Sequence, residues 1–213
     1  MISGVADNRT PERVGLESLE AIFSNFTPRR HASGDLRCAA VLLLLIEEVE
    51  DGPIDVFFIR RSDKAPSHAG QVAFPGGGIQ EEDADNWRAA LRESHEEVGL
   101  DPDRVKHLGF LDDYVTVTGY HVTPCVGLVK GRFDAVPNPR EVAETFRVPL
   151  EVLRVLESSA YERAEIPGIT FRALCYEDQV IWGATAAMLH SFLKLIDSKP
   201  LFTGSLNDPI GYD

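Results

Sequence analysis

Cysteine is scarce in this chain of 213 residues, which carries only Cys38, Cys125 and Cys175. The three are odd in number and widely scattered, and no two of them form a C-x-x-C pair. Neither a disulfide framework nor a zinc site is therefore indicated. Such sparing use of cysteine is typical of a protein that works in a reducing compartment.

Long hydrophobic runs are also lacking. The longest, residues 38–46, has nine residues, whereas a membrane-spanning helix needs about 20. The first 30 residues do not show the basic start and apolar stretch of a signal peptide. We therefore expect a cytoplasmic protein that does not engage a membrane.

Positive charge is in short supply, because 21 Lys and Arg residues stand against 34 Asp and Glu residues, for a net charge of −13. Nucleic acids and anionic membranes bind clustered Lys and Arg, so neither is an expected partner. An acidic protein can still handle phosphorylated substrates where divalent cations lie between its carboxylates and the phosphates. With 44% hydrophobic and 26% charged residues, the composition is that of a globular protein of one domain with short additions.

Hydrophobic periodicity predicts one mixed α/β unit. An N-terminal helix is expected from Thr10, as N-cap, to about Phe26. Apolar and β-branched runs predict strands at 37–47, 54–59, 105–117, 121–130, 168–176 and 180–182. Further helices are expected at 85–98, 150–156 and 185–196, a glycine-rich loop at 74–78 and a proline-rich loop at 135–140.

Three glutamates lie close together on the helix expected at 85–98. Glu93, Glu96 and Glu97 follow i, i+3, i+4 spacing, so their carboxylates share one face, turned about 130° from the apolar stripe. A solvated acidic face is the ordinary interpretation of such a triplet. The glycine-rich loop, Arg92 beside the first glutamate and Gly99 at the helix end favour instead a site for a hard divalent cation and a phosphate.

The stretch from the glycines to Leu100, ending in R-E-S-H-E-E-V-G-L, resembles the Nudix box, G-x5-E-x7-R-E-U-x-E-E-x-G-U. Strict spacing places Gly78 at the first glycine of the box and Ala84 where a glutamate is usual. One extra residue in the spacer places Gly77 and Asp83 there instead. Ser94 stands where the box has an aliphatic residue.

The resemblance extends from about Arg37 to Leu195 and is specifically to the coenzyme A pyrophosphatase branch of the Nudix hydrolases. In that branch a one-residue longer spacer is familiar, which favours Gly77 and Asp83. The chain departs from the branch at Ile59, where Thr is expected, and at Pro66, where Arg is expected. The segments that carry the likeness are 61–62, 68–77, 83–84, 90–93, 117–124 and 181–186.

This resemblance implies an α/β Nudix fold, with a mixed β-sheet packed between helices in an α/β/α sandwich. The expected division is an N-terminal helix and tail at 1–30, a Nudix hydrolase domain at 31–198 and a C-terminal tail at 199–213. It also implies hydrolysis of a diphosphate in a small nucleotide substrate, with Mg²⁺ or Mn²⁺ as cofactor. The implied metal ligands are Glu93, Glu96 and Glu97.

Further residues receive expected roles from the resemblance and from their types. Arg92 is expected to orient Glu96. Arg60, Arg61, Gly76 and Gly77 are candidates for substrate binding, although arginines at a strand end are often only solvated. Glu141 and Glu144, expected in a loop, are candidates for a general base or for plain surface charge. Tyr120 and Trp182 could stack on an adenine or belong to the core, and His68 and His121 are expected to form hydrogen bonds and not to bind metal.

Three functions remain open at this point. The leading hypothesis is cleavage of coenzyme A or its derivatives into 3′,5′-ADP and 4′-phosphopantetheine. The second is the same chemistry on ADP-ribose, a nucleotide sugar, NADH or a dinucleoside polyphosphate, which Ile59 and Pro66 keep in play. The third is a binding module that does not hydrolyse, against which the intact glutamates argue. A homodimer is an open possibility.

Overall fold

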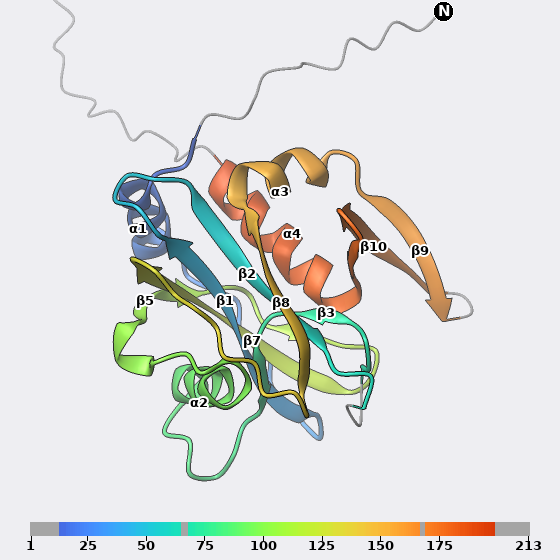
Figure 1. Ribbon diagram of the computed structural model, residues 1–213. Coiled ribbons are helices and arrows are strands. Elements are labelled where there is room, and N and C mark those ends of the chain that lie inside the picture. Colours follow the sequence, from blue (N-terminus) through green and yellow to red (C-terminus); the bar gives the residue numbers. More distant parts are fainter. Residues whose placement is uncertain (1–12, 65–67, 167–168, 199–213) are drawn as a thin grey trace, which may run out of the picture.

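A mixed β-sheet forms the centre of the molecule in the computed structural model, which describes residues 13–64, 68–166 and 169–198. Eight strands within these residues belong to it, with β3-β2-β1-β7-β5 side by side, while β4, β6 and β8 pair with β1, β7 and β2 (Figure 1). The strands are β1 Arg37–Glu47, β2 Ile54–Arg61, β3 Val72–Ala73, β4 Gly76–Gly78, β5 Lys106–Phe110, β6 Tyr114–Val115, β7 Tyr120–Lys130 and β8 Val142–Pro149.

Strand β1 lies in the middle of the sheet. It runs parallel to β7 along its whole length and antiparallel to β2 and β4. Its unbroken apolar sequence follows from burial on both faces, which removes the need for polar residues at alternate positions. Leu43 and Leu45 pack on one face, and Leu42 and Leu44 on the other.

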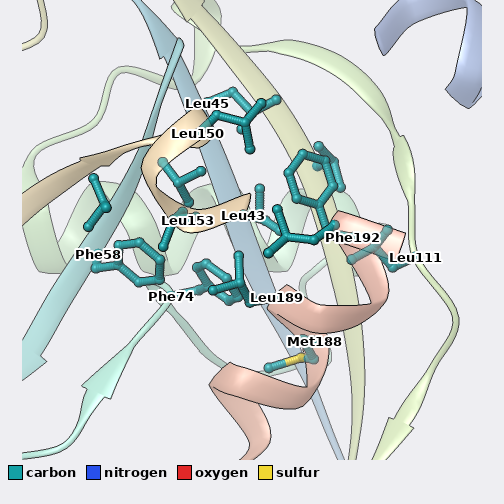
Figure 2. Close-up of a cluster of buried hydrophobic side chains, with 14 of the residues drawn as sticks. Leu43, Leu45, Phe58, Phe74, Leu111, Leu150, Leu153, Met188, Leu189 and Phe192 are labelled. Carbon is teal, nitrogen blue, oxygen red and sulfur yellow. The ribbon is translucent and has the colours of Figure 1, made fainter. Parts of the chain in front are cut away.

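Helices cover both faces of the sheet. Helix α2, Asn86–Val98, packs on one face, while α1 Leu16–Asn25, α3 Leu150–Glu157 and α4 Gly183–Asp197 lie on the other (Figure 1). Figure 2 shows Phe58 and Phe74 beside Leu153 and Leu189 in the core under α3 and α4. The predicted α/β sandwich with a mixed sheet is confirmed.

A smaller sheet stands beside the main one and leads into α4. Its strands are β9 Tyr161–Ile166, β10 Ile169–Tyr176 and β11 Gln179–Trp182, all antiparallel in the order β11-β10-β9. The last residue of β11, Trp182, is directly followed by the first turn of α4. The small sheet thereby brings aromatic side chains close to the main sheet. A short 3-10 helix, Pro102–Arg104, connects α2 with β5.

The N-terminal helix differs from the sequence prediction. It begins at Leu16 after Gly15, and residues 13–15 are not helical, so the prediction of helix over these three residues is wrong. Thr10 itself lies outside the described residues, as does the predicted tail at 199–213. Gly15 makes no side-chain cap, and the apolar contacts of Leu19 and Phe23 with the core hold the helix in place.

Several strand predictions also need correction. The glycine-rich loop contains β4, which pairs with β1, and Glu144 lies within β8 and not in a loop. The strand predicted at 105–117 is split into β5 and β6. Strands β3, β8 and β9 were not predicted, because they are short or carry charged residues at exposed positions. Among the described residues no helix is long and apolar enough to cross a membrane.

Candidate active site

Helix α2 has well-defined ends, and these fix where its glutamates lie along the helix axis. Asp85 is the N-cap and accepts a hydrogen bond from the Arg88 N–H at 2.7 Å. Gly99 ends the helix in the left-handed conformation, with φ 67°, which glycine adopts without steric cost. The helix ends before Gly99 as the sequence predicts and begins one residue after the predicted start at 85.

Glu97 is the most buried of the three glutamates. Its side chain is 2% exposed, and its Oε2 accepts the Gly76 N–H at 2.9 Å. Arg61 approaches its Oε1 only at 3.5 Å. Burial is the main cause that raises the pKa of Glu97 to about 7, and the negative charges of Glu93 and Glu141 raise it as well. The Gly76 N–H and Arg61 act in the opposite direction and lower it. Glu97 lines the cavity, and its burial comes from β4, which the helix pattern alone does not predict.

The hydrogen bond from the Gly76 N–H to Glu97 requires a glycine at position 76. Its φ is 149°, and a Cβ added there would lie 2.4 Å from the Ala40 carbonyl oxygen. The close pairing of β4 with β1 depends on this absence of a side chain. The same pairing aims the Gly76 N–H at Glu97.

Glu93 lies directly against the next glycine of β4. A Cβ on Gly77 would come within 2.5 Å of the Glu93 carboxyl carbon, whereas a Cβ on Gly78 would meet nothing within 4 Å. Burial raises the pKa of Glu93, the hydrogen bond from Arg92 lowers it, and the charges of Glu96 and Glu141 raise it further. The carboxylates of Glu93 and Glu97, called the inner carboxylates below, thus have too little positive charge around them to offset their burial.

Arg92 connects α2 to the loop that precedes it. Its guanidinium donates to both carboxylate oxygens of Asp83 at 2.9 Å, to Glu93 at 2.9 Å and to the Gly78 carbonyl at 3.0 Å. Hydrogen bonds from Arg92 hold the pKa of Asp83 below its usual value. The expected Glu96 contact exists at 3.4 Å but is the longest of these. Asp83 thus occupies the position of the box glutamate, in agreement with the longer spacer.

Glu96 is set apart from the other two glutamates. Its side chain is 50% exposed and bends toward Arg92, so it does not line the cavity beside Glu93 and Glu97. Across residues 13–64, 68–166 and 169–198, no three Asp, Glu, His or Cys side chains form a ready-made metal cluster. Glu96 would have to exchange its contact with Arg92 to join its neighbours.

A cavity of about 680 Å³ extends from the inner carboxylates between the main sheet and the elements that lead into α4. Arg61, Glu93, Glu97 and Glu141 form its polar end, and Tyr120, Phe171, Trp182 and Met188 add aromatic and apolar side chains to its wall. Polar and apolar walls therefore share one space large enough for a nucleotide-sized ligand.

The donor set at the polar end fits a divalent cation. Three carboxylates line it, the charges of Glu93 and Glu141 raise the pKa of Glu97, and the facing cation, Arg61, makes only one long contact with Glu97. Oxygen ligands of this kind suit Mg²⁺ and similar hard ions. An added positive charge would offset the burial of Glu93 and Glu97.

The other predicted residues divide into two groups. Arg61, Gly76, Gly77, Glu141, Tyr120, Trp182 and His68 line the cavity. Arg60 and Glu144 do not; they pair with each other across β2 and β8 at 3.1 Å. His68 contacts Gln71 at 3.0 Å and His121 contacts Asp113 at 3.0 Å, so both form hydrogen bonds as expected.

Sequence reasoning did not identify part of the cavity wall. This part of the wall comes from three distant segments, which contribute Tyr114 with Thr116, Phe171, and Met188 and meet only through the packing of the two sheets and α4. No local motif marks them. The predicted aromatic residues, Tyr120 and Trp182, were noted because they stand within the segments that carry the family likeness.

Fold and site together define an α/β protein with acidic side chains in the wall of a cavity large enough for a nucleotide. Its sequence matches the NUDIX domain model over residues 36–167. The chain belongs to the Nudix family. The prediction of a Nudix pyrophosphohydrolase is confirmed at this level, and divalent metal ions are the general cofactors of such hydrolases.

Known relatives agree with this assignment. The chain is similar to "Uncharacterized Nudix hydrolase NudL" of Yersinia pestis (strain Pestoides F), with 40% identity over 80% of this chain and 85% of the relative. It is also similar to "Nudix hydrolase 15, mitochondrial" of Arabidopsis thaliana, with 36% identity over 71% of this chain. The match spans only 55% of that plant protein.

Among solved structures, the NUDIX domain of Shewanella oneidensis NrtR complexed with ADP ribose is 17% identical, with a TM-score of 0.44. The match covers 62% of this chain and 84% of that one.

Proposed function

We propose that this protein hydrolyses the diphosphate linkage of coenzyme A or its derivatives, giving 3′,5′-ADP and 4′-phosphopantetheine. The observation that supports this most is the single cavity that joins Glu93 and Glu97 to an aromatic wall containing Tyr120 and Trp182. Coenzyme A can use both parts of such a cavity, because its charged diphosphate adjoins an adenosine whose ring can lie against aromatic side chains. The family assignment supports the reaction type, and the motif likeness supports the substrate.

The proposed cofactor is Mg²⁺ or Mn²⁺, held by Glu93, Glu96 and Glu97. When bound, such an ion lowers the pKa of a water molecule and neutralises phosphate charge. The Gly76 N–H holds Glu97 in place, and Arg92 holds Glu93. These fixed carboxylates limit the reorganisation needed when the substrate binds.

Proton transfer from the attacking water requires a base close to the diphosphate. Glu141 lines the cavity at the polar end and remains a candidate beside the three helix glutamates. Its Oε1 accepts the Asn138 side-chain N–H at 3.1 Å, which orients it. Glu144 is the weaker candidate because it pairs with Arg60 away from the cavity.

Substrate phosphates are proposed to meet Arg61, with Gly76 and Gly77 providing close backbone approach. The Arg61 side chain is 20% exposed, its Nε is buried without a hydrogen-bond partner, and its one contact with Glu97 is 3.5 Å long. A phosphate oxygen would satisfy this guanidinium better than Glu97 does. Arg60 has a weaker claim, since it pairs with Glu144.

A second candidate is the same reaction on ADP-ribose, a nucleotide sugar, NADH or a dinucleoside polyphosphate. Pro66 favours it, because the coenzyme A signature has an arginine there; this residue lies outside the described part of the chain. Ile59 favours it less. Its side chain is fully buried in the core under α2 and does not line the cavity, so the change from Thr removes no ligand contact.

A substrate panel with Mg²⁺, with Mn²⁺ and with EDTA tests the proposal. Release of 3′,5′-ADP and 4′-phosphopantetheine from coenzyme A, faster than cleavage of the other diphosphates, is the expected outcome. Efficient turnover of ADP-ribose with none of coenzyme A would select the second candidate. Tight ligand binding with no turnover of any diphosphate would indicate a binding module.

We also propose a cytoplasmic location and a homodimer. The dimer is tested by light scattering on purified protein, in which a mass near twice 23.5 kDa is expected. A mass equal to one chain at micromolar concentration would contradict it.

A further inference from the structure

Beside the cavity lies a positive charge that the proposed chemistry at the glutamates does not use and that is not itself part of the cavity wall. Arg37, the first residue of β1, has an exposed side chain whose guanidinium lies 4.1 Å from the centre of the Tyr120 ring. Its Nη2 donates to the Thr118 carbonyl at 3.5 Å. Among the described residues no carboxylate pairs with Arg37, although the protein carries a net charge of −13.

Strand geometry places this arginine on the cavity side of the sheet. Alternate residues of a strand face the same way, and Ala39 and Val41, the next two residues on the Arg37 face, both line the cavity. Tyr120, the direct partner of Arg37 across the strands, lines it as well. Arg37 is not a lining residue, but it lies next to the stretch of cavity wall that Ala39 and Tyr120 form.

The separation between Arg37 and the glutamates along the strand follows from the register of β1. Gly77, which lies against Glu93, pairs with Ala40, three residues beyond Arg37. Three strand residues correspond to about 10 Å. The backbone of Arg37 is therefore displaced along β1 from the position of Gly77 and Glu93, so a group bound by Arg37 is distinct from one bound at the glutamates.

Hydroxyl groups complete the surroundings of Arg37. Thr116 and Thr118 line the cavity, and their hydroxyl oxygens lie 3.0 Å apart. The Thr116 hydroxyl also accepts the Tyr120 N–H at 2.9 Å, which fixes the turn. Val117, between them, lines the cavity and is 58% exposed, so this part of the cavity opens to solvent.

We propose that Arg37, with the hydroxyls of Thr116 and Thr118, forms a second anion subsite that binds a phosphate monoester on the ribose of the substrate. The inference rests on the proposed function and sharpens it. It selects nucleotides that carry a phosphate away from the diphosphate, such as coenzyme A, over those that do not. A guanidinium binds phosphate through charge-assisted hydrogen bonds. Because Arg37 is exposed, it is more accessible to a terminal phosphate monoester than to a diphosphate enclosed within the substrate.

Binding of the two nucleotide fragments tests this without relying on turnover. Calorimetric titration in Mg²⁺ compares 3′,5′-ADP with 5′-AMP, which differ only in the 3′-phosphate. We expect the wild type to bind 3′,5′-ADP about tenfold more tightly. Arg37→Gln removes this preference and leaves 5′-AMP binding unchanged, while Arg37→Lys keeps most of it. Arg132→Gln, at a 75% exposed arginine paired with Asp134, is the matched control and keeps the wild-type preference.

Turnover then separates the subsite from the reaction. With coenzyme A, Arg37→Gln is expected to raise KM about tenfold with little change in kcat, and to leave the KM for 3′-dephospho-coenzyme A unaltered. Equal losses on both substrates, or a wild type without preference for 3′,5′-ADP, would overturn the subsite. If the preference holds but coenzyme A is not cleaved in Mg²⁺, the subsite stands and the proposed reaction falls.

Discussion

Glu93 occupies the space that a side chain on Gly77 would need, since a Cβ there would lie 2.5 Å from its carboxyl carbon. Gly77→Ala must therefore push this carboxylate away from its present position beside Arg92. A shift of about 1 Å at a reacting site can lower the rate about 100-fold. We expect a loss of that size in kcat for the diphosphate substrate, with the protein still folded.

Gly78→Ala is the matched control for this change, because a Cβ there meets nothing within 4 Å. Its effect on kcat is expected to be far smaller. Steady-state kinetics of both variants, together with their thermal unfolding midpoints, provide the comparison. Equal kcat for the two variants would show that the contact between Gly77 and Glu93 has no functional weight.

The second prediction concerns Asp83, which binds the guanidinium of Arg92. Arg92 in turn donates a hydrogen bond to Glu93. Asp83→Asn removes the charge that receives two hydrogen bonds from Arg92. Loss of such a supporting partner typically costs about tenfold or more in metal affinity or activity. We expect the Mg²⁺ concentration for half-maximal activity to rise by about this factor. Glu82→Gln, at the exposed neighbouring residue, should leave it unchanged; the same rise in both variants would exclude a specific role for Asp83.

Glu97 predicts a pH dependence of stability in the metal-free protein. Burial raises the pKa of Glu97 to about 7 in the folded state, from its ordinary value of 4.5. Between pH 4.5 and about 7, the folded state therefore keeps a proton on Glu97 that the unfolded state has already released. The stabilising contribution is present below pH 4.5 and is lost as the pH rises through about 7, with a total change of about 3 kcal/mol.

Urea unfolding in EDTA at several pH values measures this contribution. Glu97→Gln keeps the shape of the side chain without its charge, so the variant should gain stability relative to wild type as the pH rises from 4.5 to 8. Comparing the two proteins cancels the other titrating groups. A difference that stays constant over this range would contradict the buried, charge-poor position of Glu97.

The parts of this fold that could be predicted from sequence are those with a local signal. Strand β1 is a continuous apolar run because both of its faces are buried, and α2 has an N-cap at Asp85 and a left-handed Gly99 at its end. The triplet Glu93, Glu96 and Glu97 was visible for the same reason. Their spacing is local, and helix geometry converts it directly into a shared face.

The remaining features depend on contacts between distant segments. Helix geometry alone places Glu97 away from the apolar stripe, but β4 folds over it and buries it. Strand β8 carries Glu144 and Arg147 at half-buried or exposed positions, so its pattern does not stand out from a loop. The aromatic wall joins Tyr120 to Phe171 and Trp182 only after the small sheet has packed beside the main one.

The most direct test of the whole account is coenzyme A turnover by wild-type protein and Glu97→Gln, followed by chromatography of the products. In Mg²⁺ the wild type should release 3′,5′-ADP and 4′-phosphopantetheine in equal amounts, and EDTA should stop the reaction. The Glu97→Gln variant should turn over coenzyme A about 100-fold more slowly or worse, because it lacks one of the proposed metal ligands and its negative charge. Turnover that is unchanged in Glu97→Gln, or undiminished in EDTA, would contradict the account.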